Sequence, residues 1–297
     1  MSDFQLDPVA VAKGEALGLM ARRIVEGFHV GDHRSPFHGF AVEFSQHREY
    51  AVGDDLRHLD WKLLGKTDRH YIRQYEQDTN FVANILLDGS ESMNFASGGM
   101  SKLDYAKLLA ACLAHIILAQ RDAVVLDIHD TVSKVRTKRM DSPGRIREIM
   151  ARLAAFEAIS GTDLGRALGD LASRMKARGI AIVVSDLLDG EEDFASGIER
   201  LRFQGSEVVV FHVLDPHEIT FPLEGAVYFR GLEGQADVVA SPAAIRKSYL
   251  ENFGAFRTRV RHACERSDAH YILADTSVPV GETLSAYLGF RKKVTAH

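Results

Sequence analysis

Cysteine, long apolar runs and excess positive charge are all scarce in this sequence. It has two cysteines, Cys112 and Cys264, which are too few for a disulfide scaffold. The longest apolar run covers residues 108–119 and contains His115, whereas a membrane-spanning helix needs about 20 apolar residues. Near the N-terminus, acidic residues precede the apolar stretch and Arg22–Arg23 follow it, which is not the order of a signal peptide. These absences predict a cytoplasmic protein without a membrane span.

The charge balance and composition narrow the function classes further. A net charge of −5 and a pI near 6.2 argue against a dedicated nucleic-acid binder, which usually carries a basic excess. Hydrophobic residues make up 46% and charged residues 26% of the 297 positions, as in soluble globular proteins. A chain of this length suggests about two domains, and it can bury a large core without metal or disulfide cross-links.

From about residue 81 onward, short apolar runs alternate with amphipathic segments. Runs rich in Val and Ile are typical of strands that helices cover on both faces. The alternation therefore predicts a doubly wound, Rossmann-like α/β domain with a mainly parallel sheet. The expected strands are Val82–Asp88, Ala123–His129, Ile180–Asp186, Glu207–Leu214 and His270–Ala274. The expected helices are Lys102–Gln120, Ser142–Phe156, Asp163–Arg178, Glu191–Gln204 and Pro242–Ser267.

The N-terminal part of the chain, residues 1–80, has a different character, and we expect it to form a separate unit, with the α/β domain covering 81–297. Pro8–Phe28 predicts an amphipathic helix. Gly31–Asn80 is rich in Gly, Arg, His and Asp with short alternating stretches, which indicates a small strand-containing unit. Two further expectations concern the α/β domain: an edge strand within Thr131–Thr137, and a hairpin inserted at 216–240.

The most informative polar residues follow the first expected strand of the α/β domain. Asp88 ends that strand, and Ser90 and Ser92 lie in the loop after it. In doubly wound sheets, ligands bind beyond the carboxyl ends of the strands, where the strand order reverses. One carboxylate and two hydroxyls are hard oxygen donors of low total charge, which suits Mg²⁺.

Two more segments supply donors that such a site would need. Thr162 lies in a loop before a helix that Asp163 can cap, and Asp186 ends another strand of the parallel type. The topology would bring these loops together with Ser90 and Ser92. The alternative is that all these residues are ordinary turn and capping residues, because turns are rich in Ser and Asp.

The set resembles the metal-ion-dependent adhesion site of von Willebrand factor A-type domains, whose pattern is Asp-x-Ser-x-Ser, then Thr, then Asp. The resemblance implies that Ser90, Ser92 and Thr162 contact the metal, while Asp88 and Asp186 hold its waters and orient the serines. It also implies that an acidic side chain of a protein partner completes the coordination of Mg²⁺. Selection against Mn²⁺ or Ca²⁺ depends on the geometry of the cavity.

A second resemblance, to the bacterial domain-of-unknown-function family 58, covers residues 31–291. It rests on Glu43–Phe44, Arg48, Tyr50 and the stretch 53–61 (GDDLRHLDW), and on downstream matches at 214–216, Tyr249, Tyr271 and 283–291. That family is similar to components encoded with MoxR-type AAA+ ATPases. The resemblance therefore implies a non-enzymatic adaptor that works with such an ATPase and a client protein in protein maturation.

A competing hypothesis is a Mg²⁺-dependent phosphohydrolase or phosphotransferase with Asp88 as its nucleophile, because carboxylates at such strand ends can be phosphorylated. A phosphatase of this type needs a second acid two residues further on, where this chain has Ser90. Neither serine lies in the Gly-x-Ser-x-Gly turn of an esterase. We therefore favour the adaptor.

Three other patterns in the N-terminal part are weaker evidence for a functional site. Gly65-Lys66-Thr67 lacks the glycine five residues earlier that a phosphate-binding loop needs. The histidines clustered between residues 29 and 70 favour hydrogen bonding over a second metal site. The charged stretch 54–60 is either a salt-bridged turn that Trp61 anchors to the core or a docking surface, and the sequence does not separate the two.

Overall fold

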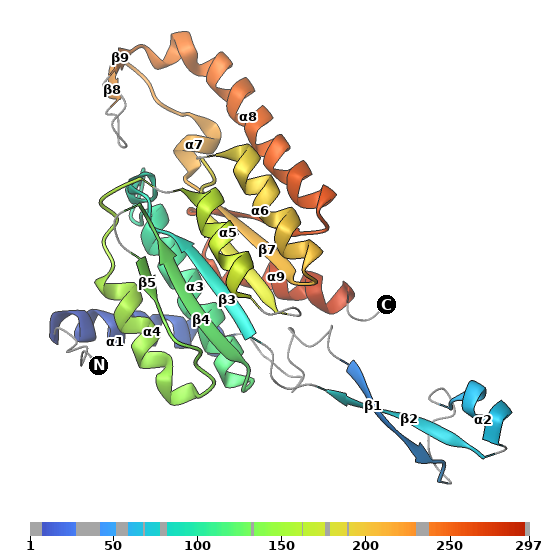
Figure 1. The fold of residues 1–297 in the computed structure, drawn as a ribbon. Coiled ribbons are helices and arrows are strands. Elements are labelled where there is room, and N and C mark those ends of the chain that lie inside the picture. The colour runs from blue at the N-terminus through green and yellow to red at the C-terminus, as the bar shows by residue number, and fades with distance from the viewer. Residues whose placement is uncertain are drawn as a thin grey trace.

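A computed structural model describes residues 8–27, 42–51, 59–67, 69–77, 82–131, 134–161, 163–175, 179–188, 190–229 and 238–294. At its centre is a six-stranded sheet with the order β10-β7-β6-β3-β4-β5 (Figure 1). The strands are β3 (Val82–Asp88), β4 (Ala123–His129), β5 (Lys134–Arg136), β6 (Ile180–Ser185), β7 (Glu207–Leu214) and β10 (His270–Asp275). All neighbours pair in parallel except β4 and β5, so the predicted parallel sheet and its edge strand are confirmed.

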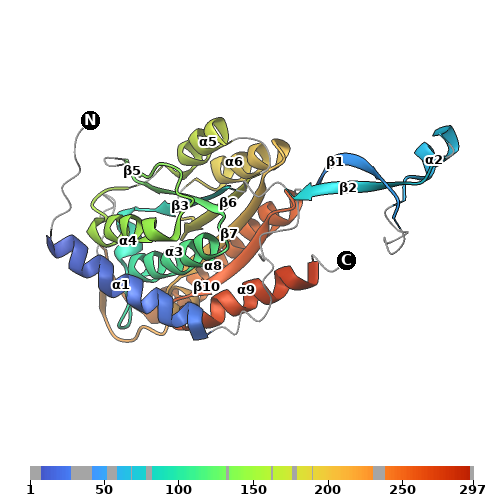
Figure 2. The ribbon, with the colours of Figure 1, turned by 90° about the horizontal axis from the view of Figure 1, so that it is seen from below.

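Helices cover both faces of this sheet, as the predicted α/β class requires (Figure 2). One buried cluster joins the sheet to α1, α3, α4 and α9, and a second joins it to α5, α6 and α8. Burial on both faces explains why β3, β4, β6 and β7 are almost continuously apolar. The helices are α1 (Pro8–Gly27), α3 (Lys102–Ala119), α4 (Ile146–Ala155), α5 (Leu164–Arg174), α6 (Glu191–Phe203), α8 (Pro242–Arg266) and α9 (Val280–Val294).

The strand order reverses at β3, which lies between β4 and β6. The chain leaves β3 for β4 on one side, and later returns to β6 on the other. At such a reversal, the loops after the two central strands diverge and leave a crevice at the carboxyl ends of the strands. The loops that follow the neighbouring strands β3 and β6 therefore border this crevice.

The N-terminal helix packs against the α/β domain. A Cβ at Gly14 would lie 3.0 Å from the backbone of Ala151 in α4, so the two helices approach closely. The thiol of Cys112 in α3 donates to the carbonyl of Ala21, at 3.8 Å. The helix expected in the N-terminal part is thus present, and it contributes to the core. The division of the chain at residue 80 stays a prediction.

Among the described residues of the N-terminal part, an antiparallel pair, β1 (Val42–Glu49) with β2 (Tyr71–Gln77), extends away from the sheet (Figures 1 and 2). The short helix α2 (Trp61–Thr67) follows β1 in the chain. The hairpin expected within 216–240 is confirmed as the antiparallel pair β8 (Val227–Phe229) and β9 (Val238–Ala240). No helix in the described part of the chain is long and apolar enough to cross a membrane.

Candidate functional site

Asp88 and Asp186 lie at the reversal of strand order. β3 and β6 pair in register up to Leu87 and Val184, so both aspartates follow at the same edge of the sheet. Each carboxylate is almost completely buried. Two buried carboxylates at one edge repel each other, and this repulsion requires positive charge or hydrogen-bond donors close by.

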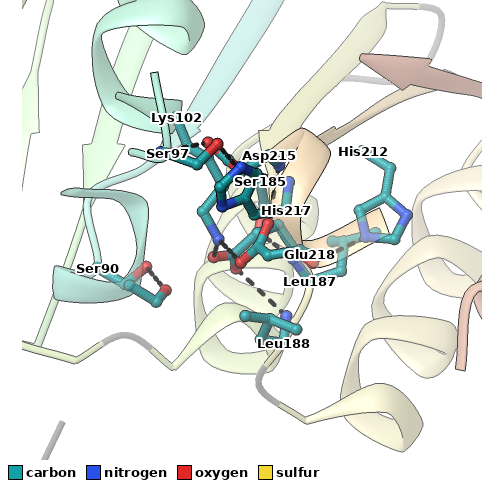
Figure 3. A network of polar contacts seen from close by, with 12 residues as sticks. Ser90, Ser97, Lys102, Ser185, Leu187, Leu188, His212, Asp215, His217 and Glu218 are labelled. Atoms are coloured by element: carbon teal, nitrogen blue, oxygen red, sulfur yellow. Dashed lines mark hydrogen bonds and ion pairs between the residues drawn. The ribbon is translucent and has the colours of Figure 1, made fainter. Parts of the chain in front are cut away.

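Ser90 and Ser92 lie beside these aspartates, in the loop and short 3₁₀ helix η2 (Glu91–Asn94) that follow β3. Their Oγ atoms are 2.9 Å apart (Figure 3). Two oxygen ligands at right angles around Mg²⁺, at its usual Mg–O distance of about 2.0–2.1 Å, are also about 2.9 Å apart. Around Ca²⁺ the same two ligands would be about 3.3–3.7 Å apart. The two hydroxyls hydrogen-bond to each other, and this distance also fits two neighbouring Mg²⁺ ligands.

Asp88 links this loop to the end of β6 through its two carboxylate oxygens. Oδ1 accepts a hydrogen bond from the backbone N–H of Ser90 at 3.0 Å, and Oδ2 accepts one from the hydroxyl of Ser185 at 2.5 Å. Burial, and then the negative charge of Asp186, raise the pKa of Asp88 to about 7, although these hydrogen bonds oppose the shift. A cation bound at the two serines would favour the ionised carboxylate.

Thr162, the third predicted metal ligand, lies outside the described residues. The loop before it is held against the serine loop, because Ser160 forms a parallel bridge with Ser90 and its carbonyl accepts from the N–H of Glu91 at 2.8 Å. After it, Asp163 caps α5 as predicted, by accepting from the N–H of Arg166. The segments on both sides of Thr162 thus have defined positions.

Lys102, which the sequence did not single out, neutralises Asp186. Its Nζ lies 2.7 Å from Oδ2 of Asp186 and 2.6 Å from Oε1 of Glu218, and its side chain has no exposed surface (Figure 3). Burial lowers the pKa of Lys102, but the charges of Asp186 and Glu218 outweigh it and raise the pKa above its ordinary value. The ammonium is therefore a permanent charge beside the site.

Glu218 belongs to α7 (Pro216–Thr220), a one-turn helix that the sequence analysis did not anticipate. Asp215 caps this helix, and Glu218 accepts from the N–H of Asp215 at 2.8 Å, which completes a capping box. Asp215 also accepts from the N–H of Ser97 at 2.8 Å and from its hydroxyl. These bonds tie α7 to the loop between η2 and α3, and thereby to the site.

His212 in β7 supports the backbone at Asp186 rather than offering a ligand. Its Nε2 lies 2.8 Å from the carbonyl oxygen of Asp186, and its Nδ1 lies 2.9 Å from the hydroxyl of Tyr271. Burial lowers the pKa of His212 to about 4, so the ring is neutral at physiological pH. A neutral ring fits this apolar position, because it adds no further charge beside Lys102.

Residues 54–58 of the charged stretch, and His29, His33, His38 and His58 of the histidine cluster, lie outside the described residues. Lys66 is part of α2, so 65–67 form a helix rather than a phosphate-binding loop. Asp60 caps α2 and lies 2.9 Å from Nε2 of His47. Trp61 is 67% exposed, so the alternative in which it anchors the charged stretch to the core is wrong. Among the described residues, no group of three or more His, Cys, Asp or Glu could hold a metal ion.

Comparison with known proteins defines the family. A family described as "Protein of unknown function DUF58" matches residues 46–259. The chain belongs to this family. Uncharacterized proteins of Mycobacterium tuberculosis and Mycobacterium bovis are each 26% identical to it over 259 residues, which cover 86% of this chain and 81% of theirs.

Solved structures show weaker likeness to this DUF58 chain. A conserved hypothetical protein BatB from Bacteroides thetaiotaomicron is 17% identical, with a TM-score of 0.46. The matched region covers 72% of this chain and 100% of the BatB chain. The VWA domain of SpRpn10 is 14% identical, with a TM-score of 0.41. The matched region covers 70% of this chain and 95% of the SpRpn10 chain.

Of the five residues predicted for the DUF58 chain's site, four lie together at one edge of the sheet and the fifth is not described. The residues that the sequence analysis missed are Lys102, Ser185, His212, Asp215 and Glu218. Two of them carried a local signal: Ser185 directly precedes Asp186, and Asp215 precedes a proline in the manner of a helix N-cap. Lys102 is 84 positions from Asp186 and 116 from Glu218, so no local pattern could pair them.

Proposed function

We propose that this protein is a non-enzymatic interaction module that binds a carboxylate of a protein partner through Mg²⁺. The observation that carries the proposal is the 2.9 Å spacing of the Ser90 and Ser92 hydroxyls, beside two buried aspartates at the reversal of strand order. Ser90, Ser92 and Thr162 would hold the ion, and Asp88 and Asp186 would orient its waters. The bound ion supplies an electrophilic position that attracts an anionic oxygen. Mn²⁺ has the same ligand preferences, whereas Ca²⁺ needs a wider spacing.

A protein is the best-supported class of partner, because apolar side chains surround the site. Phe95, Ile159 and Leu188 are 37%, 67% and 47% exposed. Phe95 directly follows η2, Ile159 precedes Ser160, and Leu188 donates its N–H to Asp186 at 3.3 Å. Exposed apolar residues around a polar centre are typical of protein interfaces.

The geometry favours ligand capture over the alternative, phosphoryl transfer. A nucleophilic carboxylate needs an oxygen that can reach a substrate, but both oxygens of Asp88 accept hydrogen bonds within the fold. We therefore expect the protein with Mg²⁺ to show no turnover of a generic phosphate ester. Turnover that Asp88→Asn abolishes would contradict the proposal.

The proposal extends to a cellular role as an adaptor for a MoxR-type AAA+ ATPase and a client protein that offers the acidic residue. This part rests on the resemblance of residues 31–291 to its family. A cytoplasmic setting is compatible with the two buried, unpaired cysteines.

The test is capture of partners from a native lysate in Mg²⁺ and in EDTA, with bound proteins identified by mass spectrometry. The Ser90→Ala/Ser92→Ala variant removes both hydroxyls, and Ser206→Ala/Ser267→Ala is a control that leaves the site intact. We expect an AAA+ ATPase or a defined client to bind wild type and control in Mg²⁺ only. Partners that the site variant retains equally, or that remain in EDTA, would contradict the proposal.

A further inference from the structure

Lys102 occupies an unfavourable position for a cation. It is the first residue of α3, after the N-cap Ser101, and the N-terminus of a helix carries partial positive charge. Its side chain is also fully buried, which costs a charged group its hydration. The two carboxylates within 2.7 Å of Nζ compensate for this position, with the ring of Phe95 at 6.0 Å as a weaker contact.

These contacts place a fixed cation in competition with a metal ion. Lys102 takes the Oδ2 atom of Asp186 at 2.7 Å, while Oδ1 accepts a longer hydrogen bond from Leu188, at 3.3 Å. A divalent ion near Ser90 and Ser92 would interact with the same carboxylate and would be repelled by the ammonium.

We propose that Lys102 is an internal cation that lowers the affinity of the site for divalent metal by sharing Asp186, and that Glu218 holds it in this position. This inference rests on the metal site proposed above. Lys102 is a positioning residue here and has no contact with the partner.

Glu218 is well placed to hold the ammonium, because α7 is fixed from several sides. The second carboxylate oxygen of Glu218 accepts a hydrogen bond from the N–H of Asp215. The backbone carbonyl of Glu218 accepts one from the hydroxyl of Tyr249 in α8, at 3.1 Å. Glu218 therefore draws part of the charge of Lys102 away from Asp186. Its removal would leave the full ammonium charge on Asp186 and weaken the metal site.

The experiment measures the binding of Mg²⁺ and Mn²⁺ to the full chain by isothermal titration calorimetry, together with the thermal unfolding midpoint. We expect Lys102→Met to bind metal roughly tenfold or more tightly than wild type, because the competing charge is gone. The same variant should unfold at a lower temperature without metal, because the buried carboxylate of Asp186 and the partly buried carboxylate of Glu218 lose their partner. Glu218→Gln should bind metal several-fold more weakly than wild type. Opposite changes in the two variants distinguish competition from a merely structural role.

Two further variants keep the test decisive. Lys102→Met/Glu218→Gln leaves one fewer unpaired carboxylate, so it should fold more readily than Lys102→Met and still bind metal more tightly than Glu218→Gln. Lys107→Met removes another buried lysine of α3, whose Nζ donates to the carbonyl of Phe156 at 2.7 Å, and should change metal affinity by much less.

The outcomes separate this inference from the proposed function. Metal binding to wild type that is unchanged or weaker in Lys102→Met would overturn the role of Lys102 and leave the metal site standing. Absence of binding in wild type and in every lysine variant would overturn both. Binding that is tight only in the variants without Lys102 would support the inference in its strongest form.

Discussion

Ser185 is a residue whose side chain acts on the site through Asp88. Its hydroxyl donates to Oδ2 of Asp88 at 2.5 Å and accepts from the N–H of Leu187 at 2.9 Å. Both Ser185 and Asp88 are buried, so water cannot replace either bond. Asp88 in turn accepts from the backbone of Ser90. The hydroxyl of Ser185 thus fixes the carboxylate that orients the first predicted metal ligand.

Ser185→Ala should therefore weaken both the fold and the metal site. Loss of a hydrogen bond to a buried carboxylate costs about 1–3 kcal/mol of unfolding free energy, which urea denaturation measures. We expect metal affinity, measured by calorimetry, to fall several-fold because Asp88 can rotate. Ser206→Ala is the matched control, since Ser206 is equally buried and its Oγ has no partner among the described residues. Equal effects of the two substitutions would contradict this role of Ser185.

Single residues also show where sequence reasoning reached its limit. Asp88, Ser90, Ser92 and Asp186 were predictable because each lies at or just after a strand of strong apolar character. The importance of Lys102 was not predictable, because ion pairs between positions so far apart in the chain depend on the packed fold. Trp61 is a contrasting case, since the sequence left open whether it anchors a turn to the core, and the structure shows that its side chain is exposed.

At the level of elements, α5 and α6 lie unusually close together. A Cβ at Gly197 of α6 would lie 2.6 Å from the Cβ of Leu168 in α5. Gly165 at the start of α5 is similarly close to α6, since its Cβ would lie 2.3 Å from that of Asp193. Glycine is thus needed at these positions because the partner helix occupies the space of a side chain. Both helices begin just after loops of the candidate site, since α5 follows Thr162 and Asp163, and α6 follows the loop that begins with Asp186.

Gly197→Ala should destabilise the protein by about 1–3 kcal/mol, because the added methyl group forces the two helices apart. The measurement is the free energy of unfolding in urea. Gly169→Ala, within α5, is the matched control, since nothing lies within 4 Å of its added Cβ. Alanine there should stabilise the helix by up to about 1 kcal/mol. A neutral or stabilising effect of Gly197→Ala would show that the helix pair adapts at little cost.

Long helices and strands with a clear apolar pattern were predictable from the sequence, and short ones were not. The five expected strands and five expected helices of the α/β domain all occur, with ends shifted by only a few residues. α7 was missed because five residues are too few to show helical periodicity, although Asp215 and Pro216 form a typical helix start. α9 was not predicted as a helix, although its residues 283–291 carried part of the family resemblance.

At the scale of the whole molecule, several weak acids are buried in their neutral forms. Burial raises the pKa of Cys112 and Cys264 from 9.0, and of Tyr105 and Tyr249 from 10.0, to about 12 in each case. The folded state therefore holds their protons more tightly than the unfolded chain does. Their contribution to stability is complete below about pH 9 and is lost as the pH rises towards 12.

We therefore expect the free energy of unfolding to fall steeply between about pH 9 and pH 12, as measured by urea denaturation at each pH. Cys112→Ala/Cys264→Ala removes two of the four groups, so its stability should fall less steeply over the same range. Between pH 7 and 8 the free energies of unfolding of the variant and the wild type should change with pH in the same way, which serves as the control. Identical slopes above pH 9 would mean that the thiols do not contribute.

The same thiols test whether α1 is an integral part of the α/β domain. Cys112 lies beneath α1, whereas Cys264 lies in the cluster on the opposite face of the sheet. Gly14→Leu should displace α1 from Ala151 and increase the rate at which Cys112 reacts with a thiol reagent, as followed by peptide mass spectrometry. Cys264 should stay protected and serves as an internal control, and Gly27→Leu, in open space on the same helix, should leave both thiols unreactive. Unchanged protection of Cys112 in Gly14→Leu would instead mean that α3 and α4 bury it without α1, and that the core is complete within 81–297.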